Sequence, residues 1–77
     1  MFIFVFEDVL CDYTSGMAVI AAESLRHAQE LAHAEFGARF NYLEDFLNEE
    51  DGFRDAVAQY PTQGVPAGAL HYVYGGG

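Results

Sequence analysis

Apolar residues form two short runs at the start of the chain, separated by turn-forming residues. Residues 2–6 read Phe-Ile-Phe-Val-Phe, a pattern typical of a strand that is covered on both faces. Val9 and Leu10 are able to extend this strand beyond two acidic residues. A polar stretch ending at Gly16 leads to a second apolar run over residues 17–22. The pattern predicts an antiparallel hairpin whose first strand is central in the sheet.

The next segment has the spacing of an amphipathic helix. Ser24 is a predicted N-cap and Gly37 a predicted stop, which places the helix at residues 25–36. Arg26 and Glu30 lie four residues apart on its outer face and are expected to form an ion pair. The expected buried face consists of apolar residues at helical spacing, namely Ala28, Leu31, Ala32 and Phe36.

Two further apolar stripes follow at helical spacing. Asn41 and Glu44 match a capping box, which predicts a second helix. Its buried stripe is expected to contain Leu43, Phe46 and Leu47. The next stripe extends the helical pattern through Phe53, Ala56, Val57 and Tyr60.

A break is predicted between these two stripes. Glu50 falls on the apolar face of a continuous helix, and Gly52 weakens the middle of that helix. We therefore expect two short helices, with Asp51 as the cap of the second. The alternative is one continuous helix in which Glu50 pairs with Arg54.

The end of the chain predicts one more strand. Pro61 is expected to end the helical region, and residues 61–68 read as a loop before a strand over residues 70–74. The order of elements predicts a single α+β domain spanning residues 1–77. Its sheet is expected to be three-stranded, mainly antiparallel and in the order 2-1-3, with two or three helices on one face. The other face is expected to stay open to a partner or to a second copy.

Charge narrows the classes of partner. The 77 residues include three arginines and no lysine, and the net charge is −9. This charge argues against direct binding to nucleic acid and to anionic membranes, and it favours a basic protein surface. No apolar run approaches the ~18 residues of a membrane span. Cys11 is the single cysteine, and the start of the chain lacks the basic region of a signal peptide, so we expect a cytoplasmic protein.

Half of the carboxylates lie in one segment, residues 44–55, which reads EDFLNEEDGFRD. One interpretation is a solvated helical face that keeps an apolar-rich protein soluble. The other is a docking surface that imitates nucleic-acid phosphates and engages lysine and arginine clusters of a nucleic-acid-binding protein. The candidate partner-binding residues are Glu44, Asp45, Glu49, Glu50, Asp51 and Asp55.

No residue pattern indicates catalysis or a cofactor. Cys11 has three histidines as potential partners, but none of them lies in a recognisable motif. Glu30 and His33 have the E-x-x-H spacing of di-iron helices, yet those sites need a second such motif and further glutamates. We therefore expect a non-enzymatic protein with no catalytic residue, metal site or cofactor.

The small size, the acidity and the lack of a catalytic motif resemble those of small proteins made by bacteriophages and mobile elements to block host defences. Anti-CRISPR proteins are the best known of these. The resemblance implies a small α+β inhibitor that binds a Cas protein or complex through acidic residues, in some families by mimicking DNA. No site residue is carried over from it.

Two hypotheses follow. The first is an inhibitor whose acidic helical surface occupies a basic nucleic-acid-binding site, so that changing Glu49, Glu50 and Asp51 to lysine abolishes binding. The alternative is a small homodimeric structural or assembly protein that uses the open sheet face.

Overall fold

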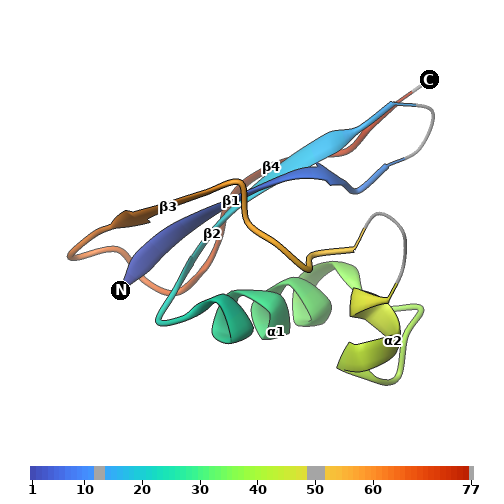
Figure 1. Ribbon diagram of the computed structural model, residues 1–77, viewed down its shortest axis with the longest axis horizontal. Helices are drawn as coiled ribbons and strands as arrows, with labels where there is room; N and C mark the ends of the chain where they lie inside the picture. The colour runs from blue at the N-terminus through green and yellow to red at the C-terminus, as the bar shows by residue number, and fades with distance from the viewer. Residues whose placement is uncertain (12–13, 49–51, 77) are drawn as a thin grey trace.

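A computed structural model describes residues 1–11, 14–48 and 52–76 of the chain (Figure 1). The four strands of this part form one antiparallel sheet in the order β3-β1-β2-β4. Both helices lie on one face of the sheet (Figure 1). The elements in chain order are β1 (Phe2–Val9), β2 (Gly16–Ala22), α1 (Leu25–Phe36), α2 (Leu43–Leu47), β3 (Ala58–Pro61) and β4 (Gly68–Val73). The predicted α+β class, the hairpin and the central first strand are confirmed.

The number and order of the strands differ from the prediction. The C-terminal strand, β4, pairs with β2 and not with β1, so the predicted order 2-1-3 is wrong. The second neighbour of β1 is β3, in a region predicted to be helical. β3 begins just after Val57, whose N–H donates to the Val5 carbonyl at 2.8 Å. Pro61 is the last residue of β3 and does not end a helix; an edge strand tolerates its missing N–H.

The core lies between the sheet and the helices. Phe4, Phe6 and Ile20 project from the two central strands and are fully buried. Ala28 and Ala32 are the fully buried residues that α1 presents to them, and their small side chains let the helix lie close to the sheet. Phe53 completes this layer, with its ring centroid 5.0 Å from that of Phe6.

A bulge in β1 directs its last residue, Val9, into the core. Glu7 pairs with Met17 and Val9 pairs with Gly16, so Asp8 is the extra residue on this strand. Asp8 has φ 57°, in the left-handed region that a short polar side chain tolerates better than most. Without the bulge, the alternation of the strand would place Val9 on the helix-free face. With it, Val9 is buried in the core.

Helix α1 begins and ends where the sequence predicts. The Ser24 side chain accepts a hydrogen bond from the His27 N–H, and Gly37 is the C-cap. Gly37 has φ −97°, a value that other residues also adopt, so the backbone conformation does not require glycine here. A side chain there would instead meet the His33 ring and carbonyl at 2.4 and 2.7 Å. The site therefore selects glycine because of close packing.

Helix α2 is shorter than predicted. Its N-cap is Tyr42, which makes no side-chain capping bond, so the capping box of Asn41 and Glu44 is wrong. The Glu44 carboxylate instead lies 2.8 Å from the Arg26 guanidinium. This ion pair takes the place of the predicted pair between Arg26 and Glu30. No helix occurs over residues 52–57, which contradicts both a second short helix and one continuous helix. Glu50 and Asp51, which the predicted break involved, lie outside the described residues.

Candidate functional site

Helix α2 holds two of the predicted site residues at the surface. Phe46 and Leu47 are buried against the core, while Glu44 and Asp45 are exposed. Both carboxylates lie in the first turn, where negative charge interacts favourably with the unpaired N–H groups of a helix. Burial of one side of this short helix therefore fixes the direction in which its acids point.

Asp55 follows Arg54, whose side chain binds the other end of the same helix. The Arg54 guanidinium donates to the Leu47 carbonyl and, at 2.9 Å, to the Asn48 carbonyl. These bonds satisfy carbonyls at the C-terminal end of α2 and bring a positive charge to the negative end of its dipole. Asp55 follows directly and is exposed. We call Glu44, Asp45 and Asp55 the acidic surface.

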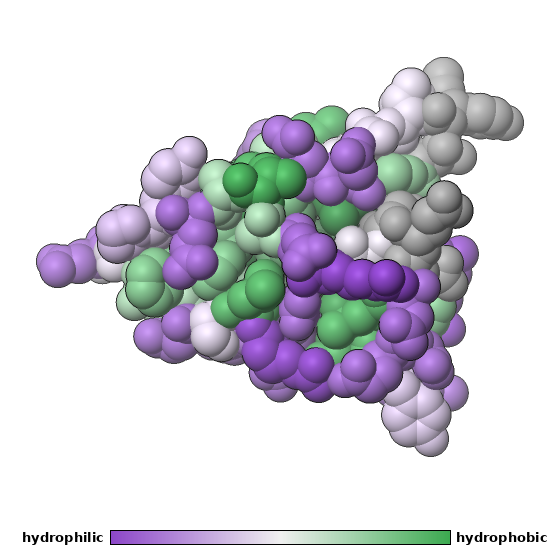
Figure 2. Space-filling model, viewed as in Figure 1, coloured by the Kyte–Doolittle hydropathy of each residue, from purple (hydrophilic) through white to green (hydrophobic). Residues whose placement is uncertain are grey.

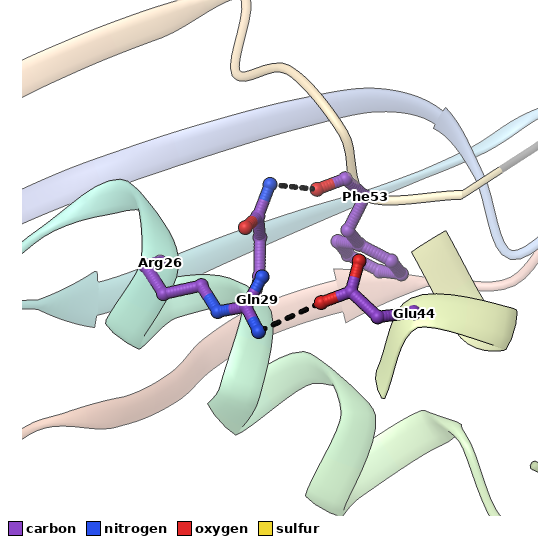
Figure 3. Close-up of polar contacts among 4 residues, drawn as sticks. All are labelled: Arg26, Gln29, Glu44 and Phe53. Atoms are coloured by element: carbon purple, nitrogen blue, oxygen red, sulfur yellow. Dashed lines mark hydrogen bonds and ion pairs between the residues drawn. The ribbon is translucent and has the colours of Figure 1, made fainter. Parts of the chain in front are cut away.

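One member of the acidic surface is already paired. The Arg26 guanidinium of α1 donates to Glu44 at 2.8 Å, and both side chains are more than half exposed (Figure 3). Within the described ranges, Asp45 and Asp55 have no such ion pair. These two carboxylates are therefore the members of the acidic surface whose charge is not offset by an ion pair within the described ranges. Glu49, Glu50 and Asp51, the other predicted site residues, lie outside the described residues.

Gln29 connects this region to α1 in the interior. It is the single buried polar residue of the described part of the chain. Its side-chain amide donates to the Phe53 carbonyl at 2.9 Å (Figure 3) and to the Arg54 carbonyl at 2.9 Å. No expectation from the sequence included Gln29. Its spacing is consistent with burial, because Gln29 lies four residues after Leu25 and three before Ala32, on the buried face of the helix. This contact fixes the backbone next to Asp55.

The rest of the charge also points outward. All eight carboxylates of the described ranges belong to exposed residues. Hydrophilic side chains gather over the helical layer in Figure 2, with apolar side chains between them. Val57 and Tyr60, predicted to be buried, are 59% and 58% exposed because the segment forms coil and an edge strand. The surface is thus acidic with apolar contacts available beside it.

The histidines take part in local backbone contacts. His27 Nδ1 accepts the Glu23 N–H at 3.1 Å, and His33 Nε2 lies 3.0 Å from the Phe40 carbonyl oxygen. Cys11 is half-buried and is a free thiol. Groups of three or more metal-ligating side chains do not occur within the described part of the chain. Nor does this part contain a helix long and apolar enough to cross a membrane.

Comparison with known proteins gives no relative for this chain. No family model matches it, and no curated protein or solved structure is significantly similar to it.

Proposed function

We propose that this chain is a non-enzymatic protein-binding inhibitor that acts in the cytoplasm of a host cell. Its acidic surface would block a basic nucleic-acid-binding site of a defence complex such as a CRISPR–Cas effector. The observation that carries the proposal is the position of Asp45 and Asp55. Both are exposed and without an ion pair among the described residues. Asp45 lies on a short helix whose other side is buried, and Asp55 follows the arginine that binds the C-terminal end of that helix.

Fixed carboxylates suit recognition of a basic site. Lysine and arginine side chains that normally contact phosphates form charge-assisted hydrogen bonds with carboxylates. Because Phe46, Leu47 and Arg54 hold the helix, its carboxylates need little ordering when a partner binds. The net charge of −9 attracts a basic partner from a distance and accelerates association.

Direct contact with nucleic acid is not part of this proposal. Arg26 is paired with Glu44, and Arg54 is occupied by two backbone carbonyls, which leaves Arg39 as the third arginine. A chain with so few available cations gains almost nothing from counterion release at a phosphate backbone. The partner is therefore the protein component of the complex.

A displacement experiment tests the proposal. Fluorescent target DNA is bound to each of a panel of purified, guide-loaded CRISPR–Cas effectors, and the anisotropy of the DNA is followed as this protein is added. We expect displacement from at least one effector, with a strength that falls as salt is raised. Unchanged DNA binding by every effector at high micromolar protein would contradict the proposal.

The second candidate function is a homodimeric assembly protein, which the helix-free sheet face favours. Residues directly opposite each other in the ladders share a face. The pairs Ile3 with Ala21, Val5 with Val19 and Met17 with Val73 therefore place an apolar band on the side that no helix covers. Among the paired strand residues on this face, Glu7 is the one carboxylate. The other polar residues among them are Tyr60 and His71.

A second copy is the occupant that this face suits best. Two such faces pack as a sandwich, and the acidic helical layers of the two copies then point away from each other. A standard interface needs ~800 Å² per partner, roughly one sixth of the chain's 4846 Å² of accessible surface. One broad face of a two-layer domain is large enough to supply that area.

A further inference from the structure

A cavity of about 400 Å³ opens at the end of the molecule where β1 ends and the C-terminal segment passes the helices. Five aromatic residues from three separate parts of the chain line it, namely Phe36, Phe40, Phe46, Phe53 and Tyr74. We call it the end cavity. Its volume is within the ~300–1,000 Å³ that small-molecule sites occupy.

The rings of the end cavity form a connected wall. Successive ring centroids are 5.9 Å apart for Phe40 and Phe46, 5.5 Å for Phe46 and Phe53, and 5.8 Å for Phe53 and Phe36. Tyr74 continues the series, with its ring edge-on to Phe36 at 6.2 Å. Phe46 and Phe53 are buried, whereas Tyr74 is 59% exposed. The cavity therefore has a closed apolar floor and an open rim.

Arg39 is the single charged side chain among the described residues that line the cavity. Its guanidinium lies 5.3 Å from the centroid of the Phe40 ring. Within the described ranges it makes no ion pair and no side-chain hydrogen bond, unlike Arg26 and Arg54. A guanidinium over an aromatic ring still offers its N–H donors in the plane of the group. The rim thus presents a cation beside an apolar wall.

The backbone at the cavity is held in an uncommon conformation. Leu10 has φ 53°, which costs a branched side chain of this kind on the order of 1 kcal/mol. The Gly75 N–H donates to the Leu10 carbonyl at 2.9 Å and holds the strand end against the C-terminal segment. Both residues line the cavity. Such strain concentrates at ligand sites, so the conformation agrees with a binding role for this end of the molecule.

From this geometry we propose that the end cavity binds a small organic anion, a carboxylate or sulfonate on an aromatic or short aliphatic body. The apolar body contacts the ring wall, and the anionic group accepts hydrogen bonds from Arg39. A cation would be repelled by that guanidinium at short range, and a neutral molecule would gain no charge-assisted hydrogen bond from it.

Three ligands with one body test the charge preference. Phenylbutyrate, phenylbutanol and phenylbutylamine are titrated separately into the protein, and amide NMR shifts give the site and the dissociation constant. We expect phenylbutyrate to bind about tenfold more tightly than the alcohol, with shifts at Leu10, Gly52 and Gly75. Equal affinity for acid and alcohol, tighter binding of the amine, or shifts confined to other regions would overturn the proposal.

Two matched variants separate the role of Arg39 from that of net charge. Arg39→Gln is expected to remove the preference for the acid while leaving alcohol binding unchanged. Arg26→Gln removes the same charge away from the cavity and should keep the preference. If Arg26→Gln abolishes the preference as fully as Arg39→Gln does, the anion does not bind at Arg39. Circular dichroism confirms that both variants are folded, and both substituted side chains are exposed.

Cys11 supplies a second measurement at the same place. It lines the cavity and is the only cysteine of the chain, so alkylation by iodoacetamide reports on one site. Phenylbutyrate at saturating concentration should slow this alkylation several-fold in the wild type. At the same concentration, phenylbutyrate should slow the alkylation of Cys11 much less in the Arg39→Gln variant. Equal rates with and without phenylbutyrate in the wild type would contradict binding in the end cavity.

Discussion

The side chain of Gln29 on α1 donates a hydrogen bond of 2.9 Å to the carbonyl of Phe53, and a second bond of equal length to the next carbonyl. This buried contact joins the helix to the segment that leads from the acidic surface to the sheet. Gln29→Leu keeps the volume and removes both donors, which leaves two carbonyls without these partners. We expect a loss of about 2 kcal/mol of unfolding free energy, measured by urea denaturation.

The control for Gln29 is an exposed glutamine. Gln63 lies in the loop between β3 and β4, and Gln63→Leu should change the unfolding free energy by less than about 0.5 kcal/mol. Equal effects of the two substitutions would show that the buried amide does not hold the segment in place.

Gly16 is expected to be intolerant of any side chain. A Cβ atom there would lie 2.1 Å from the Val73 carbonyl oxygen and 2.9 Å from the Gly75 nitrogen, and backbone cannot move aside as a flexible side chain can. Gly16→Ala should therefore lower the unfolding free energy by about 2 kcal/mol or more. Gly76→Ala is the matched control, because a Cβ atom there meets nothing within 4 Å. A thermal unfolding midpoint unchanged in Gly16→Ala would refute this account of the β2–β4 contact.

The ion pair between Arg26 and Glu44 should contribute little to stability. Both side chains are more than half exposed, so solvent screens their attraction. A double-mutant cycle with Arg26→Ala and Glu44→Ala should give a coupling energy of about 0.5 kcal/mol at low salt. At ~1 M salt, where the screening length is about 3 Å, the coupling should vanish. A coupling above ~1.5 kcal/mol that persists in salt would require a buried pair, contrary to this geometry.

The homodimer alternative predicts a specific response to charge on the helix-free face. Val19 lies opposite Val5 in one ladder and opposite His71 in the other, near the middle of that face. Val19→Lys should raise the dimer dissociation constant at least about tenfold in sedimentation equilibrium, because the ammonium would have to be desolvated. Val57→Lys makes the same change at a residue that lies outside the strands and is already 59% exposed. This control should leave the dimer dissociation constant unchanged. A wild-type chain that stays monomeric at high micromolar concentration would eliminate this alternative.

The sequence was sufficient for the elements whose signals are local. Ser24 and Gly37 delimit α1 to the residue, because a capping hydroxyl and a close-packed glycine act within one turn. The continuous apolar run over residues 2–6 predicts the central strand. The strand period of two then places Phe4 and Phe6 together on the helix side, where both are buried.

The remaining differences depend on contacts distant in sequence. Phe53, Ala56, Val57 and Tyr60 have helical spacing, yet only Phe53 is buried, and β3 forms because β1 offers a free edge. Likewise, β4 pairs with β2 and not with β1, and no local signal in the sequence distinguishes these two neighbours. The end cavity could not be predicted at all, because its lining extends from Leu10 to Gly75. Glu44, Asp45 and Asp55 are exposed, as both interpretations of the acidic segment require, but the ion pair of Glu44 with Arg26 was not predicted.

The most direct test of the central claim compares two charge-matched double variants for binding to an effector from which this protein displaces DNA. Asp45→Lys with Asp55→Lys alters the acidic surface, whereas Glu7→Lys with Glu23→Lys alters exposed carboxylates of the sheet region. Each pair changes the net charge by +4, from −9 to −5, so long-range attraction falls equally. We predict that the first pair raises the dissociation constant at least about tenfold more than the second. Equal dissociation constants for the two double variants would contradict the claim that the acidic surface is the binding site.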